Sequence, residues 1–281
     1  IVDNLYSNPD KMPKGGRYEQ QFQSAIVIMN PYDGRILALC GGVGEKEINF
    51  GLNRAVPVTS GGVNYGGATR SPGSSIKPLA SYGPALNEGI ITPDTLVNDA
   101  NYIVLSGTSW YPHNDNYENY GVLSIYQALK WSLNTVAAQI VDKLTPAESY
   151  RYLTQKLGFT SLVPADADYA PMALGALTMG VTVREMAQAY TAFVNDGIMS
   201  YGRTYSLITD DNDEIVLVNP TEQNVAIKQN TAWTMADLLQ NAAENGTGYE
   251  APFYTTAVAG KTGTTSDDKD RYFVGFTMYY V

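Results

Sequence analysis

Residues 255–281 read TTAVAGKTGTTSDDKDRYFVGFTMYYV, two β-rich runs on either side of the polar turn TTSDDKD. Near the other end of the chain, residues 24–42 read SAIVIMNPYDGRILALCGG, in which Asn-Pro-Tyr-Asp-Gly separates two apolar runs. That composition is typical of a β-hairpin. Helical patterns lie between the two ends of the chain. This order predicts an α/β domain in which the N- and C-terminal strands form an antiparallel sheet with helices on both faces.

The helical patterns cover residues 74–87, 123–144, 183–197 and 231–246. Apolar residues recur in them at steps of three and four, as expected for amphipathic helices. Residues 204–227 read as short strands around a DDNDE turn. Residues 1–21 are polar and contain Pro, Lys and Gly, so we interpret them as a linker from a missing upstream region. The predicted domain therefore spans residues 22–281.

The composition excludes several classes of protein. The chain has 281 residues, 44% hydrophobic and 16% charged, which indicates a globular rather than a disordered protein. A net charge of −10 argues against nucleic-acid binding, because there is no basic surface to neutralise phosphates. No run reaches the roughly 18 apolar residues that span a membrane. The single cysteine, Cys40, lies in the apolar run ILALC, which predicts a small buried side chain.

The first candidate for chemistry is the stretch RSPGSSIKP, residues 70–78, with Ser74, Ser75 and Lys77. Ser-x-x-Lys places two side chains one turn apart on the same helix face. A serine hydroxyl is a poor nucleophile until a base takes its proton, and lysine is a base only when its pKa is lowered. A chain of this length contains about one such motif by chance, and Ser266–Lys269 is a second. The motif alone fits a nucleophile and an ordinary helix start equally well.

Two further motifs favour the nucleophile. Ser132-Leu133-Asn134 is the only Ser-x-Asn in the chain, and Lys261-Thr262-Gly263 is the only triplet of its kind. Taken singly, Ser132 fits a helix cap and Lys261 fits a solvated strand end. A lysine and hydroxyls on an edge strand also suit the carboxylate of an extended peptide, and a glycine lets the backbone approach. The occurrence of all three motifs in this order indicates one shared site.

The three motifs together resemble the motif set of penicillin-binding proteins and serine β-lactamases. RSPGSSIKP, WYPHNDNYENYGVLSIYQALKWSLN, ALGALTMGVTVREMAQAYTAFVNDG and AGKTGTTSDDKDRYFVGFT resemble the transpeptidase domain of class A, bifunctional penicillin-binding proteins. The resemblance spans about residues 22–281. It implies the β-lactamase/transpeptidase-like fold and a peptidoglycan D,D-transpeptidase that cross-links stem peptides.

The resemblance also implies the catalytic roles. Ser74, directly after Pro-Gly, is the expected nucleophile, while Ser75 lies on another helix face and is expected to be expendable. Lys77 is expected to take the serine proton, Ser132 to relay a proton to the leaving amine, and Lys261 to supply positive field.

Substrate binding is implied for five residues. Asn134 is expected to hold the substrate amide, Thr262 and Thr264 its terminal carboxylate, and Gly263 to allow close approach. Trp110 is expected either to line the cleft or to pack in the core. The backbone N–H groups of Ser74 and Thr264 are the expected oxyanion hole.

The same resemblance implies the partners and the location. The expected substrates are peptidoglycan stem peptides ending in D-Ala-D-Ala, and β-lactam antibiotics are expected to acylate the same serine. Neither metal nor organic cofactor is expected. An upstream glycosyltransferase domain is expected but absent from this sequence. The expected location is the extracytoplasmic face of a bacterial membrane, with an anchor outside this chain and a role in cell-wall biogenesis and cell shape.

Alternative functions remain on the same scaffold. A β-lactamase or D,D-carboxypeptidase hydrolyses its acyl-enzyme, and in class A β-lactamases a glutamate serves that step. Glu148 and Glu185 lie in helical patterns without the usual loop context. A non-catalytic penicillin-binding sensor is a further alternative. His113, the only histidine, lies in a polar aromatic loop, and Asp267, Asp268 and Asp270 read as a solvated turn rather than a cation site.

Overall fold

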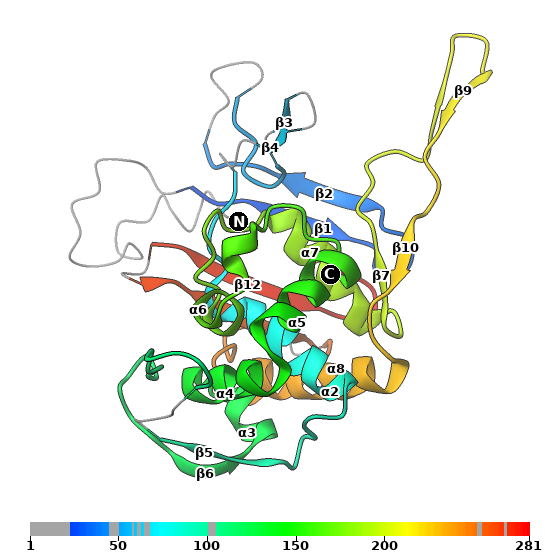
Figure 1. The fold of residues 1–281 in the computed structure, drawn as a ribbon. Helices are drawn as coiled ribbons and strands as arrows, with labels where there is room; N and C mark the ends of the chain where they lie inside the picture. Colours follow the sequence, from blue (N-terminus) through cyan, green and yellow to red (C-terminus); the bar gives the residue numbers. More distant parts are fainter. Residues whose placement is uncertain are drawn as a thin grey trace.

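The two termini of the domain meet in one layer of strands. The computed structural model describes residues 23–44, 51–57, 59–60, 63–64, 68–100, 105–251, 255–266 and 269–281. The predicted linker over residues 1–21 lies outside this part, as do Asp267 and Asp268. β1 (Ile26–Met29) pairs antiparallel with β2 (Ile36–Cys40), and β11 (Ala259–Thr264) pairs antiparallel with β12 (Arg271–Phe276). Reciprocal backbone hydrogen bonds of 2.8 and 3.1 Å join Met29 to Val281, so the C-terminus lies beside β1 (Figure 1).

The predicted α/β class and the two terminal hairpins are confirmed. α7 (Val183–Val194) packs on β1 and β12, and α8 (Gln229–Asn245) packs on β11. The described strands pair two by two, so their hydrogen bonds do not form one continuous sheet. The other strands are β3 (Thr59–Ser60), β4 (Val63–Asn64), β5 (Leu96–Asp99), β6 (Gly121–Ser124), β7 (Ile198–Ser200), β8 (Leu207–Thr209), β9 (Ile215–Val218) and β10 (Gln223–Val225).

The predicted helix over residues 74–87 is a continuous helical run of three parts. These are the 3₁₀ turn η2 (Gly73–Ile76), the π-helical turn η3 (Pro78–Tyr82) and α2 (Gly83–Asn87). The remaining helices are α3 (Ile125–Lys130), α4 (Asn134–Leu144), α5 (Pro146–Arg151), η4 (Tyr152–Lys156), η5 (Pro164–Asp166) and α6 (Tyr169–Leu174). None of the helices in the described ranges is both long and apolar enough to cross a membrane.

The prediction of a single helix over residues 123–144 is wrong, because the helix is interrupted at Ser132. Ser124 and Gln127 form a capping box that starts α3. Ser132 then adopts a left-handed backbone with φ of +58°, and Leu133 is extended before α4 begins at Asn134. Apolar periodicity continues across the break, since both helices face the same core, and so the pattern alone does not reveal it.

An aromatic cluster joins α7 to the C-terminal strand. The rings of Tyr190 and Phe193 lie 5.3 Å apart, and that of Phe276 on β12 lies 6.5 and 6.4 Å from them. All three side chains are buried. Aromatic pairs at these separations stabilise a core by about 0.5–1.5 kcal/mol beyond their area burial. This cluster fixes α7 against the strand layer.

The prediction of a buried Cys40 is wrong. The side chain is exposed at the end of β2, and its Sγ lies 3.1 Å from the carbonyl oxygen of Gly42. Leu37 and Ala38 on the same strand are exposed as well. An apolar run predicts a strand, but it does not tell which strand lies outermost in the layer.

Candidate active site

Two glycines bring the N-terminal end of the helical run onto β11. Gly73 has φ of +54°, and a Cβ atom there would lie 2.4 Å from the carbonyl oxygen of Thr264. A Cβ atom on Gly263 would lie 2.1 Å from the carbonyl oxygen of Pro72. Contacts this short exclude any side chain at either position. The Pro-Gly before Ser74 and the glycine of Lys-Thr-Gly therefore make one close backbone contact, which places η2 beside the strand.

The structure distinguishes the two neighbouring serines. Ser75 is fully buried, and its hydroxyl donates to the carbonyl oxygen of Pro72 over 2.7 Å. The carbonyl oxygen of Ser75 accepts a 2.7 Å hydrogen bond from the Tyr190 hydroxyl. Ser74 is only partly buried. Ser74 is thus the serine open to a ligand, while Ser75 stabilises the turn; the expectation that Ser75 is expendable therefore concerns the chemistry and not the stability.

Lys77 joins the first two motifs. Its side chain is fully buried, and its Nζ lies 2.6 Å from the carbonyl oxygen of Ser132 and 2.7 Å from Asn134 Oδ1. The Ser132 hydroxyl lies 3.3 Å from the same nitrogen. Ser-x-x-Lys and Ser-x-Asn, more than fifty residues apart in sequence, therefore share one cluster of polar atoms.

The surroundings of Lys77 favour the neutral amine. Burial lowers the pKa of Lys77 well below its usual value, and the nearby Lys261 lowers this pKa further, whereas Asp115 opposes the shift. A neutral amine donates two hydrogen bonds, which the two close carbonyl-type oxygens can accept. Its lone pair is then left to accept a proton from a hydroxyl group. This is the state that a general base requires.

Asn134 is oriented by the loop that precedes β6. Its backbone N–H donates to Asn114 Oδ1 over 2.8 Å, and its side-chain Nδ2 donates to the carbonyl oxygen of His113 over 3.0 Å. With its amide nitrogen held by His113, Oδ1 of Asn134 faces Lys77. The loop thereby fixes which end of the amide meets the lysine.

Asp99 and Asn114 form a buried support behind Asn134. Asn114 Nδ2 lies 2.9 and 3.0 Å from the two carboxylate oxygens of Asp99. Asp99 is 1% exposed and also accepts the Tyr120 backbone N–H and the Thr135 hydroxyl. A buried carboxylate is costly unless donors surround it, as they do here. Sequence reasoning missed this pair, because nothing in the loop sequence shows that it folds back onto α4.

Lys261 is the buried cation of the third motif. It is 1% exposed, and its Nζ lies 3.1 Å from the carbonyl oxygen of Thr262 and 3.4 Å from Thr247 Oγ1. Burial lowers the pKa of Lys261 to about 7. Thr247 Oγ1 also accepts a 2.8 Å hydrogen bond from the Thr262 hydroxyl. Thr247 directly follows the helix stop at Gly246, and sequence reasoning missed its place beside Lys261.

The remaining predicted binding residues are Thr264 and Trp110. Thr264 is exposed at the end of β11, with its backbone against Gly73. Trp110 is half-buried and packs against the hydrophobic core, so its role in lining a cleft stays a prediction. His113 is exposed and stacks on Tyr117 with ring centroids 4.3 Å apart. Its Nδ1 lies 3.1 Å from the backbone oxygen of Asn114 rather than beside a carboxylate, unlike the histidine of a Ser-His-Asp triad.

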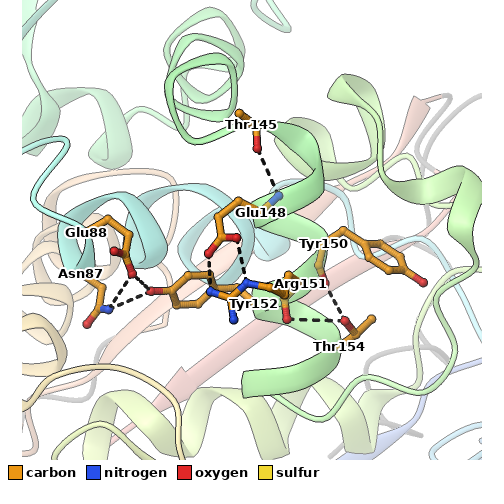
Figure 2. A network of polar contacts seen from close by, with 8 residues as sticks. All are labelled: Asn87, Glu88, Thr145, Glu148, Tyr150, Arg151, Tyr152 and Thr154. Carbon is orange, nitrogen blue, oxygen red and sulfur yellow. Dashed lines mark hydrogen bonds and ion pairs between the residues drawn. The ribbon is translucent and has the colours of Figure 1, made fainter.

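Glu185 and Glu148 are the two candidates for a base that activates a hydrolytic water, and both bind other residues. Glu185 is buried, and its carboxylate accepts hydrogen bonds from Thr160, Ser161 and Thr182. Glu148 pairs with Arg151, as Figure 2 shows, and lies in α5. Both carboxylates therefore serve as structural acceptors.

The acidic turn after β11 is described only in part. Asp270 pairs with Arg70 over 3.6 Å, while Asp267 and Asp268 lie outside the described residues. Among the residues with described positions, no group of three or more His, Cys, Asp or Glu side chains could hold a metal ion.

An α/β fold with Ser-x-x-Lys at a helix start, Ser-x-Asn at an interhelical turn and Lys-Thr-Gly on the adjoining strand defines the class of penicillin-interacting proteins. The chain belongs to the family of penicillin-binding protein transpeptidase domains, whose model matches residues 24–278. The resemblance found in the sequence, including its class A character, is confirmed.

The relatives to which the chain is similar in sequence are penicillin-binding proteins. Penicillin-binding protein 1A of Clostridium acetobutylicum is 35% identical over 268 residues, which cover 92% of this chain and 32% of that protein. Penicillin-binding protein 4 of Bacillus subtilis is 31% identical, over 92% of this chain and 39% of that protein. The chain thus spans about a third of the length of these relatives.

Solved structures show the same fold. The D,D-transpeptidase domain of a peptidoglycan glycosyltransferase from Eggerthella lenta superposes with a TM-score of 0.74 at 23% identity, over 91% of this chain and 70% of that one. Penicillin-binding protein A from M. tuberculosis, solved as an imipenem acyl-enzyme complex, gives a TM-score of 0.74 at 18% identity, over 91% and 65% of the two chains. The predicted β-lactamase/transpeptidase fold is confirmed.

Proposed function

We propose that the domain is a serine-type D,D-transpeptidase of peptidoglycan synthesis and that Ser74 is its nucleophile. One observation carries the proposal. Lys77, three residues after Ser74 on the same helical run, is fully buried and bound by Ser132 and Asn134, and its pKa is lowered. A lysine whose neutral form is favoured at this place is the base that a serine hydroxyl lacks.

The reaction proceeds through two acyl transfers. Ser74 Oγ attacks the carbonyl carbon between the two D-alanines of a stem peptide while Lys77 takes the hydroxyl proton. The tetrahedral intermediate collapses to an ester of Ser74, and the terminal D-alanine leaves after Ser132 delivers a proton to its nitrogen and takes one from Lys77. The amine of a second stem peptide then attacks the ester, gives up a proton that passes to Ser74 Oγ, forms the cross-linking amide and releases Ser74. A β-lactam enters the same first step, and its opened ring stays attached to the serine.

The strand β11 supplies substrate recognition. Buried Lys261 contributes a positive field near the site, and the hydroxyls of Thr262 and Thr264 hold the terminal carboxylate of the stem peptide. The Gly263 backbone lies against the turn before Ser74. This contact supports the proposal that the backbone N–H groups of Ser74 and Thr264 form one oxyanion hole. Preorganised N–H donors of this kind typically contribute 10²–10³-fold to the rate. Asn134 aligns the substrate amide while it also binds Lys77.

One observation favours transfer over hydrolysis. Glu185 and Glu148 are held by structural hydrogen bonds, so neither is free to activate a water molecule. No cofactor is required, because the scheme moves only protons and acyl groups among serine, lysine and substrate. The β-lactamase or carboxypeptidase alternative predicts fast hydrolysis of the acyl-enzyme, and the sensor alternative predicts acylation without turnover.

The cellular setting follows from the chemistry of the substrate. Stem peptides are cross-linked outside the cytoplasm, so we place the domain at the extracytoplasmic face of a bacterial membrane. Because the relatives are about three times as long as this chain, an anchor and a glycosyltransferase domain upstream are part of the proposal.

The deciding experiment supplies a donor stem peptide ending in D-Ala-D-Ala and an acceptor stem peptide, and follows products by mass spectrometry. A transpeptidase yields the cross-linked dimer with release of one D-alanine per cross-link, and Ser74→Ala abolishes the dimer. Products shortened by D-alanine without a dimer identify a carboxypeptidase. An acylated protein with no released peptide product identifies a sensor. Either result would overturn the proposal.

A further inference from the structure

The β8–β9 hairpin, residues 207–218, projects away from the body of the domain. Figure 1 shows it in yellow as an arm that leaves the strand layer beyond β7 and β10. Leu207 pairs with Val218 and Ile208 with Leu217, and within the described residues neither strand pairs with any other. Each strand therefore has one free edge of backbone N–H and carbonyl groups.

Both faces of this hairpin are apolar and exposed. β9 reads Ile-Val-Leu-Val, with Ile215, Val216 and Val218 exposed by 63%, 67% and 59%. A continuous run of β-branched and aliphatic residues is typical of a strand that is covered on both faces. An isolated two-stranded hairpin is marginally stable in water, and large exposed apolar patches mark interaction sites. The sequence of β9 thus fits a covered strand, although the domain itself does not cover it.

The base of the hairpin is anchored in a fixed direction. The backbone N–H of Asn219 donates to the carbonyl oxygen of Ser206 over 2.8 Å. Arg203 donates from Nη1 to the carbonyl oxygen of Asn219 over 2.7 Å and from Nε to that of Asp33 over 3.1 Å. These bonds tie the hairpin to the β1–β2 turn. A preorganised element of this kind loses little entropy when a partner binds.

All charged side chains of the hairpin are acidic. Residues 204–227 contain no lysine or arginine, and the tip between the strands carries Asp210, Asp211, Asp213 and Glu214. Asp210 Oδ1 accepts the backbone N–H groups of Asn212 and Glu214 over 2.8 and 2.9 Å, which holds the turn. The other three carboxylates are exposed. Their charges repel an anionic lipid surface and the acidic tip of a second copy, whereas they attract a basic surface.

We propose that the β8–β9 hairpin is a docking arm for a partner protein whose apolar surface, flanked by lysine or arginine, covers β9. The apolar faces supply the buried area, and the free strand edge accepts an extended backbone segment of the partner. The acidic tip meets the basic flank and sets the orientation. The arm lies outside the Ser74 site, so its occupation is independent of the acylation chemistry.

The test uses the full-length protein in the cells that make it, with the photo-cross-linking residue p-benzoylphenylalanine in place of Val216. The matched control carries the same residue in place of Asp237, an exposed position on α8. After irradiation, mass spectrometry identifies the protein and the peptide attached at each position. A second series combines Asp211→Asn, Asp213→Asn and Glu214→Gln and leaves the turn-holding Asp210 in place.

The expected product at position 216 is an adduct with one other protein, through an apolar peptide that lies beside lysine or arginine. The control position does not give this adduct. Removal of three tip charges lowers the yield by about tenfold, while penicillin labelling of Ser74 is unchanged. The proposal is overturned by adducts with a second copy, with the upstream part of the same chain or with lipid, and by the absence of an adduct. It is also overturned by an adduct whose yield does not respond to the tip charges.

Discussion

Lys77 Nζ and Asn134 Oδ1 lie 2.7 Å apart and connect the helical run that carries Ser74 to the first residue of α4. The orientation of the Asn134 amide depends on the His113 carbonyl and on Asn114, which in turn rests on buried Asp99. The position of the proposed base is therefore set by a loop, a turn and a strand end that are distant in the sequence. Substitutions of the residues that support Asn134 should therefore change the position of Lys77.

The first prediction concerns Asn114. Asn114→Ala removes the acceptor of the Asn134 backbone N–H and the side-chain nitrogen that donates to Asp99. We expect acylation by a labelled penicillin to slow by about 100-fold, because a misplacement of about 1 Å has that effect. We also expect a loss of about 1–3 kcal/mol in the free energy of unfolding, since the buried carboxylate of Asp99 loses one of its donors.

The control for this variant is Asn116→Ala. Asn116 lies in the same loop and is exposed. Within the part of the chain that the structure describes, its side chain bonds to two other loop residues, Glu118 and Tyr120. Acylation of this variant should stay within about twofold of the wild-type rate, as is usual for surface positions. Equal acylation rates in the two variants would show that Asn114 does not position the site.

The second prediction separates the two serines. Ser74→Ala should abolish covalent labelling by penicillin, because it removes the nucleophile. Ser75→Ala should keep the labelling and lower the free energy of unfolding by about 1 kcal/mol, since it removes a buried hydrogen bond to Pro72. Peptide mapping identifies the labelled serine, and urea denaturation measures the free energy of unfolding. A label found on Ser75 would refute the assignment of the nucleophile.

The comparison of sequence and structure shows which features follow from local pattern. Ser132 and Lys261 lie far along the chain from Ser74 and Lys77, and the occurrence of the three motifs in one order was sufficient to predict a shared site. The two terminal hairpins were predictable because strand and turn signals are local. Asp99, Asn114 and Thr247 could not be found in this way, since their roles depend on how a loop and a helix end fold onto other elements. Cys40 was misplaced because strand order determines burial and apolarity alone does not.

The third prediction uses the low pKa of Lys261. Burial lowers the pKa of this amine from 10.5 to about 7, so between these values the unfolded chain binds more protons than the folded one. Stability then rises with pH across this window, with a slope of at most about 1.4 kcal/mol per pH unit for one group. Below pH 7 both states are protonated, and the cost of the buried charge is present in full.

Lys261→Met tests this linkage. The variant lacks the contribution of Lys261 to the slope, and that of Lys77 becomes smaller, because Lys261 no longer lowers the pKa of Lys77. We expect the methionine variant to gain stability relative to wild type at pH 6 and to lose that advantage progressively toward pH 10. Urea denaturation at pH 6, 8 and 10 measures the difference. A constant difference across the three values would mean that folding does not lower the pKa of Lys261.

The last prediction concerns the left-handed backbone of Ser132. A non-glycine residue with φ of +58° carries a conformational cost of about 1 kcal/mol that glycine avoids. Ser132→Gly and Ser132→Ala both remove the hydroxyl 3.3 Å from Lys77, so both should lower turnover of stem peptides to a similar extent. The glycine variant should nevertheless be more stable than the alanine variant by about 1 kcal/mol, because only glycine relieves the backbone. Urea denaturation of the pair isolates this strain, since the two variants differ by one methyl group. If the alanine variant proved as stable as the glycine variant, the turn at Ser132 would not be strained, and its conformation would reflect the packing of α3 and α4 alone.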